Sequence, residues 1–212
     1  MPKQTYALER DGEKRLEISW KTGWKNFQVL LDDQVVATVE DRNELDGGKT
    51  VNLPDKSKLF IKLKTSFFSS GIILEHNDVP IPGSLEDPYQ NLKNIYGFLY
   101  LMAVFEIFIG ATAAFSGFEP LVNMGIGPIT IVLGVVIGLL GFWLSKKSYV
   151  ALGLFMLVYA ADTVYSMTIA LESSPMDILM RFIIFYYVGM GFKVLKSVKQ
   201  QDLEDGQIKK LS

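Results

Sequence analysis

The sequence predicts a membrane protein in which a small all-β N-terminal domain, an antiparallel sandwich or partly open barrel, precedes a four-helix transmembrane bundle. Three observations predict this fold class. Apolar and polar residues alternate early in the chain, four long apolar runs fill the second half, and charged residues concentrate before Lys93 and after Lys193. Half-buried strands produce such alternation, and a helix of about 20 apolar residues crosses a ~30 Å hydrocarbon layer.

We therefore divide the chain of 212 residues into four parts. Residues 1–84 are predicted to form the β domain, 85–94 a neck, 95–198 the transmembrane domain and 199–212 a charged tail. The neck is expected to contain a short interfacial helix that begins at Asp87-Pro88, since proline fits the first turn of a helix. The tail is expected to be disordered or a frayed helix.

The β domain is predicted from apolar residues at every second position. The segments Leu16–Trp20, Phe27–Leu31 and Leu59–Leu63 show this period of two, which is typical of antiparallel strands with one face on a core. Turn-forming residues such as Asp32-Asp33-Gln34 separate them. We expect about seven short strands, as in a small sandwich or open barrel, and no helix before Glu86.

Four apolar runs are the predicted membrane spans: Ile95–Phe118, Gly125–Leu144, Tyr149–Leu171 and Ile178–Leu195. Basic residues mark one end of these runs: Lys93, the linker Ser145-Lys146-Lys147-Ser148, and Lys193, Lys196 and Lys199. The two opposite linkers, Glu119–Met124 and Glu172–Asp177, contain no lysine or arginine. Because basic loops stay in the cytoplasm, we expect four spans with both termini cytoplasmic.

Small residues recur along the second run at Gly134, Gly138 and Gly141. In lipid, glycines at this spacing let two helices approach closely. Gly189 and Gly191 in the fourth run have the same character. The pattern favours helix packing within the bundle, and packing between copies of the chain is the alternative.

Three ionisable residues interrupt the apolar runs: Glu106, Asp162 and Arg181. A charge in the middle of a membrane costs about 2.5–3.5 kcal/mol on insertion scales, so these groups should pair, be neutral or face the bundle interior. With a rise of about 1.5 Å per residue, the depths of Asp162 and Arg181 allow an ion pair. Tyr159 and Ser166 share a helix face with Asp162 and extend this predicted polar cluster.

Two hypotheses account for the polar cluster. In the first, Glu106 and Asp162 relay protons or cations and Arg181 is their gate or counter-ion, because intramembrane carboxylates are often functional. In the second, the cluster is an interhelical clamp that sets the register of the bundle. Four short helices without broken segments give little room for alternating access, which favours the clamp.

Aromatic residues and the single histidine are the other candidates in the β domain. Phe67 and Phe68 lie in a predicted loop, where they could contact the bilayer or a partner, or pack in the core. Trp20 and Trp24 flank a predicted turn, and core packing is favoured over an aromatic ligand site. Few acidic residues lie near His76 in the sequence, so we expect this histidine to lie at a turn or strand edge and to bind no metal ion.

The β domain contains four short motifs, namely Leu16-Glu17-Ile18, Asn26–Leu31, Asn52-Leu53-Pro54-Asp55 and Gly71–Asp78. In these motifs it resembles the Fas apoptotic inhibitory molecule family, whose members are soluble. The whole chain also resembles uncharacterised bacterial membrane proteins in which a β domain ends in a segment like Pro82–Pro88 before four spans. This resemblance implies the predicted fold. It implies no activity, because the eukaryotic family lacks the membrane part and its cell-death role does not carry over.

Composition and spacing narrow the expected function. The formal net charge of −2 argues against nucleic-acid binding, and the absence of cysteine excludes disulfides and thiolate chemistry. No nucleophile–base or metal-ligand spacing is evident, so we expect a protein that is not an enzyme and has no cofactor. The leading hypothesis is a membrane scaffold, assembly factor or regulator whose cytoplasmic β domain binds a protein partner. The alternative is a proton, cation or small-solute carrier, and lipid binding through Phe67 and Phe68 is a further hypothesis.

Overall fold

A computed structural model describes residues 2–10, 12–65, 70–123, 125–169 and 175–211, with the side chains of 70, 166, 169, 175, 177 and 204–211 excepted. The chain forms two compact units, Met1–Asn91 and Leu92–Ser212. The division falls inside the segment 85–94 that the sequence predicts as a neck. The two units are described separately below.

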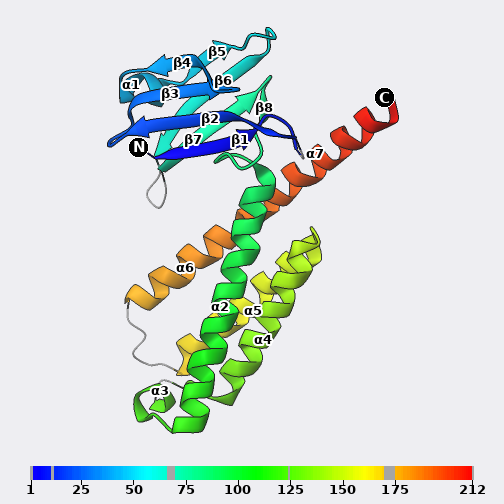
Figure 1. Ribbon diagram of the computed structural model, residues 1–212. Coiled ribbons are helices and arrows are strands. Elements are labelled where there is room, and N and C mark those ends of the chain that lie inside the picture. Colours follow the sequence, from blue (N-terminus) through cyan, green and yellow to red (C-terminus); the bar gives the residue numbers. More distant parts are fainter. Residues whose placement is uncertain (1, 11, 66–69, 124, 170–174, 212) are drawn as a thin grey trace. The chain divides into compact units, whose positions relative to one another are not determined.

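The N-terminal unit contains two four-stranded antiparallel sheets (Figure 1). The first sheet has the order β1 (Lys3–Ala7), β2 (Lys14–Lys21), β3 (Lys25–Leu31), β4 (Gln34–Val39). The second has the order β5 (Lys49–Asn52), β6 (Lys58–Thr65), β7 (Ser70–His76), β8 (Val79–Pro80). An all-β N-terminal domain is thus confirmed, and its described strands include β1, which the alternation did not single out.

One hydrophobic core lies in this unit, and the alternating residues supply it. Leu16 and Ile18 of β2 are fully buried, and Ile18 is paired in register with the buried Val29 of β3. Leu59 and Ile61 of β6 are buried in the same way. The intervening side chains point away from this core, as the period of two predicts.

A short helix, α1 (Arg42–Gly47), connects the two sheets and corrects the expectation of no helix before Glu86. Asp41 caps it by accepting a hydrogen bond from the Asn43 N–H at 3.3 Å. Gly48 ends it with a φ of 85°. Only Leu45 of this helix is buried, so the sequence carries no helical period that could have predicted it.

The segment after β8 is held to the second sheet by backbone hydrogen bonds. The Ile81 N–H donates to the Leu74 carbonyl at 2.9 Å, and the Leu85 N–H donates to the Ile72 carbonyl at 3.1 Å. Gly83 has a φ of 82°, a conformation that favours glycine. The segment Ile81–Leu85 therefore follows the edge of the second sheet.

Helix α2 (Pro88–Ser116) begins at the predicted Asp87-Pro88 step. The Asp87 carboxylate caps it by accepting the Tyr89 N–H at 3.0 Å and also accepts the Gly83 N–H at 2.8 Å. The helix continues without a break for 29 residues. Residues 88–94, expected as a separate interfacial helix, are instead its first turns, because nothing after Pro88 interrupts the backbone hydrogen bonds.

The C-terminal unit is helical and contains α2 from Leu92 onward, followed by α3 (Glu119–Asn123), α4 (Pro128–Ser145), α5 (Tyr149–Ile169), α6 (Pro175–Gly189) and α7 (Gly191–Leu211). Three described helical stretches are long and apolar enough to cross a membrane, namely Pro88–Ser116, Pro128–Ser145 and Ile178–Leu203. The described apolar part of α5, Tyr149–Tyr165, is shorter. This composition indicates an integral membrane protein.

Two predicted irregular segments in this unit are helical. The linker after the first run contains α3, and the tail expected to fray is helical as far as Leu211 in α7. Helical hydrogen bonds also continue between α6 and α7, since the Met190 N–H donates to the Tyr186 carbonyl and the Val194 N–H donates to the Met190 carbonyl. The two helices therefore form one apolar stretch.

Candidate functional site

Close packing between α2 and α4 depends on the predicted glycines. A Cβ added at Gly134 would lie 2.7 Å from the Ile107 Cγ1 and 2.9 Å from the Ala103 carbonyl oxygen. A Cβ at Gly141 would lie 3.3 Å from the Leu99 Cβ. Side chains at these positions would push the helices apart, so glycine permits this close approach of α2 and α4 within one chain.

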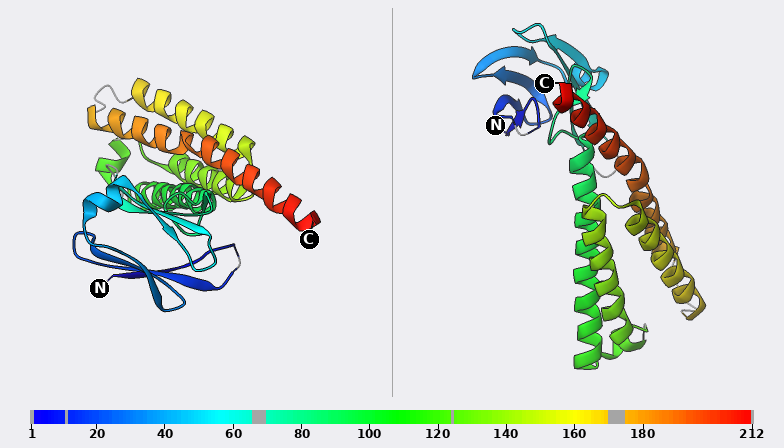
Figure 2. Two further views of the ribbon diagram at one scale, coloured as in Figure 1. Left: turned by 90° about the horizontal axis from the view of Figure 1, so that it is seen from above. Right: turned by 90° about the vertical axis from the view of Figure 1, so that its right-hand side faces the viewer.

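Helices α2 and α4 lie side by side (Figure 2). Two further glycines belong to the contact between them. A Cβ at Gly138 would lie 3.4 Å from the Ala103 Cβ. Gly110 of α2 was not predicted, yet a Cβ there would lie 2.9 Å from the Ile131 backbone nitrogen. The sequence gives little indication of its role, because no other glycine lies within one helical turn of Gly110.

Helix α5 runs antiparallel to the apolar stretch formed by α6 and α7. A Cβ at Gly189 would contact Met156 at 3.5 Å, and a Cβ at Gly191 would contact Leu152 at 3.2 Å. Near the start of α5, Tyr149 stacks on Phe192 with ring centroids 6.5 Å apart. These contacts place Asp162 and Arg181 at matching heights on neighbouring helices.

The polar cluster centres on an ion pair between these two residues. The Arg181 Nη1 lies 2.8 Å from the Asp162 Oδ2 and 3.3 Å from the Thr163 Oγ1. The Thr163 hydroxyl donates to the Tyr159 carbonyl at 2.7 Å. The pair that the predicted depths allow is thus present, and Thr163 joins it as a residue that the sequence analysis did not place in the cluster.

Glu106 lies on the face of α2 that approaches α4, next to Gly134. It is close enough to Asp162 and Arg181 for an electrostatic interaction with both. Among the described residues, no hydrogen bond or ion pair involves its carboxylate. The cluster therefore contains two carboxylates and one guanidinium. Ser166 lies on α5, but its side chain is outside the described part of the chain.

Three of the predicted candidates in the β domain, Trp20, Trp24 and His76, lie within the described residues. Trp20 and Trp24 stack with centroids 4.6 Å apart and pack against the core, as expected. His76 is the last residue of β7, and the described residues contain no cluster that could hold a metal ion. Phe67 and Phe68 fall outside the described residues, so their predicted contact with a membrane or partner stays a prediction.

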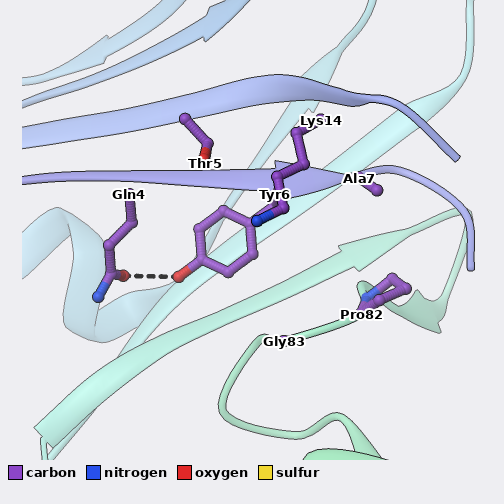
Figure 3. A pocket seen from close by; sticks show the side chains of 7 residues that line it. All are labelled: Gln4, Thr5, Tyr6, Ala7, Lys14, Pro82 and Gly83. Atoms are coloured by element: carbon purple, nitrogen blue, oxygen red, sulfur yellow. Dashed lines mark hydrogen bonds between the residues drawn. The ribbon is translucent and has the colours of Figure 1, made fainter. Parts of the chain in front are cut away.

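A hollow of about 450 Å³ lies beside β1 (Figure 3), and sequence reasoning missed it. Its lining residues are Gln4, Thr5, Tyr6, Ala7, Lys14, Pro82 and Gly83. The Tyr6 hydroxyl donates to the Gln4 Oε1 at 2.6 Å, and burial raises the pKa of Tyr6. No motif marks this hollow because it forms between residues that are about 75 positions apart in the chain.

Arg10, from the connection between β1 and β2, stacks on the start of α2. Its guanidinium carbon lies 3.3 Å from the centroid of the Tyr89 ring, and its Nη2 lies 3.6 Å from the Asp87 Oδ1. Asp87 is only 5% exposed. This cation–π contact ties the β1–β2 connection to the residues that begin α2.

Comparisons with protein-family models, curated proteins and solved structures return no match to this chain. The resemblance to the Fas apoptotic inhibitory molecule family and to bacterial membrane proteins therefore stays a prediction. Function has to be inferred from the contacts described above.

Proposed function

We propose that this chain is a multi-pass membrane scaffold, assembly factor or regulator whose β domain binds a protein partner on the cytoplasmic side. The supporting observation is a β domain with a complete core that is tied to the start of a membrane-capable helix. Asp87 caps that helix while it accepts the Gly83 N–H and lies beside Arg10. A folded domain that directly precedes a membrane-capable helix is suited to presenting a binding surface.

Four spans belong to this proposal. Helix α5 has 21 residues, which at about 1.5 Å per residue is enough to cross a ~30 Å layer. It packs antiparallel to the apolar stretch Ile178–Leu203. If that stretch crosses the membrane, α5 beside it would be surrounded by lipid as well. The proposed arrangement is a bundle of α2, α4, α5 and the joined α6 and α7.

The proposed orientation places both termini in the cytoplasm, because the linker with Lys146 and Lys147 is basic and the opposite linkers are not. The chain has no cysteine, so single cysteines can report the topology directly. A membrane-impermeant maleimide should label Asn123→Cys in intact cells and Lys146→Cys only after lysis. The opposite pattern would overturn the orientation.

Co-purification tests the proposed function. The full chain, extracted from its native membrane in mild detergent, should retain a protein partner in stoichiometric amount. Deletion of residues 1–84 should abolish this association, whereas deletion of residues 204–212 serves as the control and should preserve it. A partner that stays bound without the β domain, or the absence of any partner, would contradict the proposal.

The second candidate function, a proton or cation carrier, is favoured by the Glu106 carboxylate, which interacts electrostatically with Asp162 and Arg181 and forms no ion pair within the described part of the chain. Flux measured in proteoliposomes should then fall in Glu106→Gln and Asp162→Asn and be retained in Asp202→Asn. The direct pairing of Asp162 with Arg181 supports the clamp instead. Flux that does not change in the first two variants would eliminate the carrier.

A further inference from the structure

We propose that the β domain receives its partner at the free edge of β1, where an extended acidic segment of the partner adds a strand. This inference rests on the proposed function and names the binding site and the chemistry of the partner. The first sheet has the order β1-β2-β3-β4, so among the described strands β1 is paired on one side only. Unpaired strand edges are templates for strand addition.

The register identifies which backbone groups of β1 face outward. The Trp20 N–H donates to the Pro2 carbonyl at 3.3 Å, and the register continues with Lys3 opposite Ser19 and Gln4 opposite Ile18. Hydrogen-bonded and non-bonded pairs alternate in an antiparallel ladder. The backbone groups of Pro2, Gln4 and Tyr6 therefore face β2, and those of Lys3 and Thr5 face away from it.

The outward groups of Lys3 and Thr5 have no backbone partner among the described residues. An added strand would satisfy their N–H and C=O groups without breaking any bond between β1 and β2. The register shift between Tyr6 and Ala7 limits the addition to the part of β1 before it. A short ladder of this kind needs side-chain contacts for affinity and specificity.

The hollow beside β1 supplies these contacts (Figure 3). It is lined by four consecutive residues of β1, from Gln4 to Ala7, and by the turn residues Pro82 and Gly83. Its volume of about 450 Å³ lies within the range of about 300–1,000 Å³ that is typical of ligand pockets. Every second side chain of an added strand would point toward this space.

Charge selects an acidic segment. Lys14 lines the hollow, and among the described residues no ion pair or hydrogen bond involves its ammonium group. Lys3, by contrast, is paired with Glu17 at 2.6 Å. An aspartate or glutamate of the added strand would therefore find its counter-ion at Lys14.

Two of the other three sheet edges are obstructed. Strand β8 has only two residues, one of them Pro80, which has no N–H to donate. On β4, the Lys49 ammonium donates to the Thr38 carbonyl at 3.4 Å. Within the described part of the chain, β1 combines an open edge with an adjacent hollow and a lysine, Lys14, that forms no ion pair.

The experiment uses the full chain in detergent micelles and a library of random nine-residue peptides displayed on phage. Selected peptides are then synthesised, and their affinity is measured by fluorescence anisotropy. Thr5→Pro removes one outward N–H and leaves the bonds to β2 in place, since proline is tolerated at a strand edge. Thr5→Val keeps that N–H and is the matched control. Thermal unfolding shows whether each variant is folded.

The wild type should select peptides that alternate β-branched residues with other residues and carry an acidic one. Thr5→Pro should weaken their binding by about 10-fold or more, since one outward hydrogen bond and the fit of the strand are lost, and Thr5→Val should bind normally. Bound peptide should also slow the hydrogen exchange of the Lys3 and Thr5 amides. Lys14→Glu should select basic peptides instead, a readout that does not depend on the proline variant.

Selected peptides that bind Thr5→Pro as well as the wild type would overturn the edge site. If the co-purified partner were still lost on deletion of residues 1–84, the proposed function would stand and only its location would be wrong. A library that yields no binding peptide would also overturn the edge site. The proposed function itself fails only through the co-purification experiment.

Discussion

In the β domain Phe27 and Leu59 are fully buried, whereas on α2 Leu101 and Phe108 are 66% and 68% exposed. The first pattern has polar residues outside and a core inside, as water requires. The second leaves large apolar side chains on the surface of a helix, far more than a water-soluble helix exposes. Large apolar side chains are thus buried in one region and exposed in the other, which indicates water around the β domain and lipid around α2.

The largest expected effect concerns the aromatic residues of the two regions. Phe27→Ala should lower the free energy of unfolding by about 3–5 kcal/mol, because it leaves a cavity in the core. Phe108→Ala should change it by less than about 1 kcal/mol, because lipid is as apolar as the side chain that is lost. Unfolding by urea in detergent, followed by tryptophan fluorescence, measures both. Equal losses would remove the distinction between the regions.

A charged side chain should be costly on α2 and harmless on the surface of the β domain. Phe108→Asp should reduce membrane integration, at a cost of about 2.5–3.5 kcal/mol for a charge placed in hydrocarbon. The control, Val35→Asp on β4, replaces a side chain that is 56% exposed and should leave integration unchanged. The fraction of protein resistant to alkaline extraction gives the result. Full integration of Phe108→Asp would show that α2 does not lie in lipid at this position.

Close helix packing can be tested with a single methyl group. Gly134→Ala should cost about 1–3 kcal/mol, since overpacking forces the backbone of α2 and α4 apart. Gly153→Ala is the control, because a Cβ there would meet nothing within 4 Å. Thermal unfolding in detergent should separate the two variants. An equal midpoint would mean that α2 and α4 tolerate a wider separation than the structure shows.

The Asp162–Arg181 pair should show a measurable coupling. A double-mutant cycle with Asp162→Asn and Arg181→Gln is expected to give about 0.6–1.7 kcal/mol, the range found for polar contacts between membrane helices. The same cycle on the Lys147–Asp202 pair, whose side chains are 36% and 39% exposed, should give less. Thermal unfolding midpoints provide both values. Zero coupling at Asp162 would contradict the clamp.

The smallest effect is a pH dependence in the β domain. The Arg15 guanidinium beside Asp32 holds the pKa of that carboxyl below its ordinary value. The stabilisation is therefore complete above the ordinary aspartate pKa of about 4 and is lost as the pH falls through the lower, folded value. Asp32→Asn should lower the unfolding temperature at pH 7, and its difference from the wild type should shrink at pH 3.

Asp33→Asn is the control for this prediction, since the described residues show no ion pair for Asp33. It should follow the wild type across the whole pH range. A difference between Asp32→Asn and the wild type that stays constant down to pH 3 would mean that the Arg15 contact does not stabilise the folded state.

Several features of the site were predictable because they depend on local pattern or on simple geometry. The depths of Asp162 and Arg181 followed from residue counts along two helices, and the glycines of α4 followed from their spacing. The start of α2 at Asp87-Pro88 followed from the preferences of capping residues. Neither α1 nor Gly110 was predicted, because a helix with one buried residue and a lone glycine leave no periodic signal.

The sequence by itself determined strands such as β2, β3 and β6 and the apolar helices after Asp87, since the period of apolar residues records which side of a strand or helix faces water, core or lipid. Tertiary structure alone decided which segments meet: the edge of β1 beside Pro82 and Gly83, Arg10 on Tyr89, and Glu106 beside Gly134. Such contacts depend on strand register and helix packing between distant residues. No local pattern carries that information, because the sequence around each residue is the same whichever distant residue it contacts.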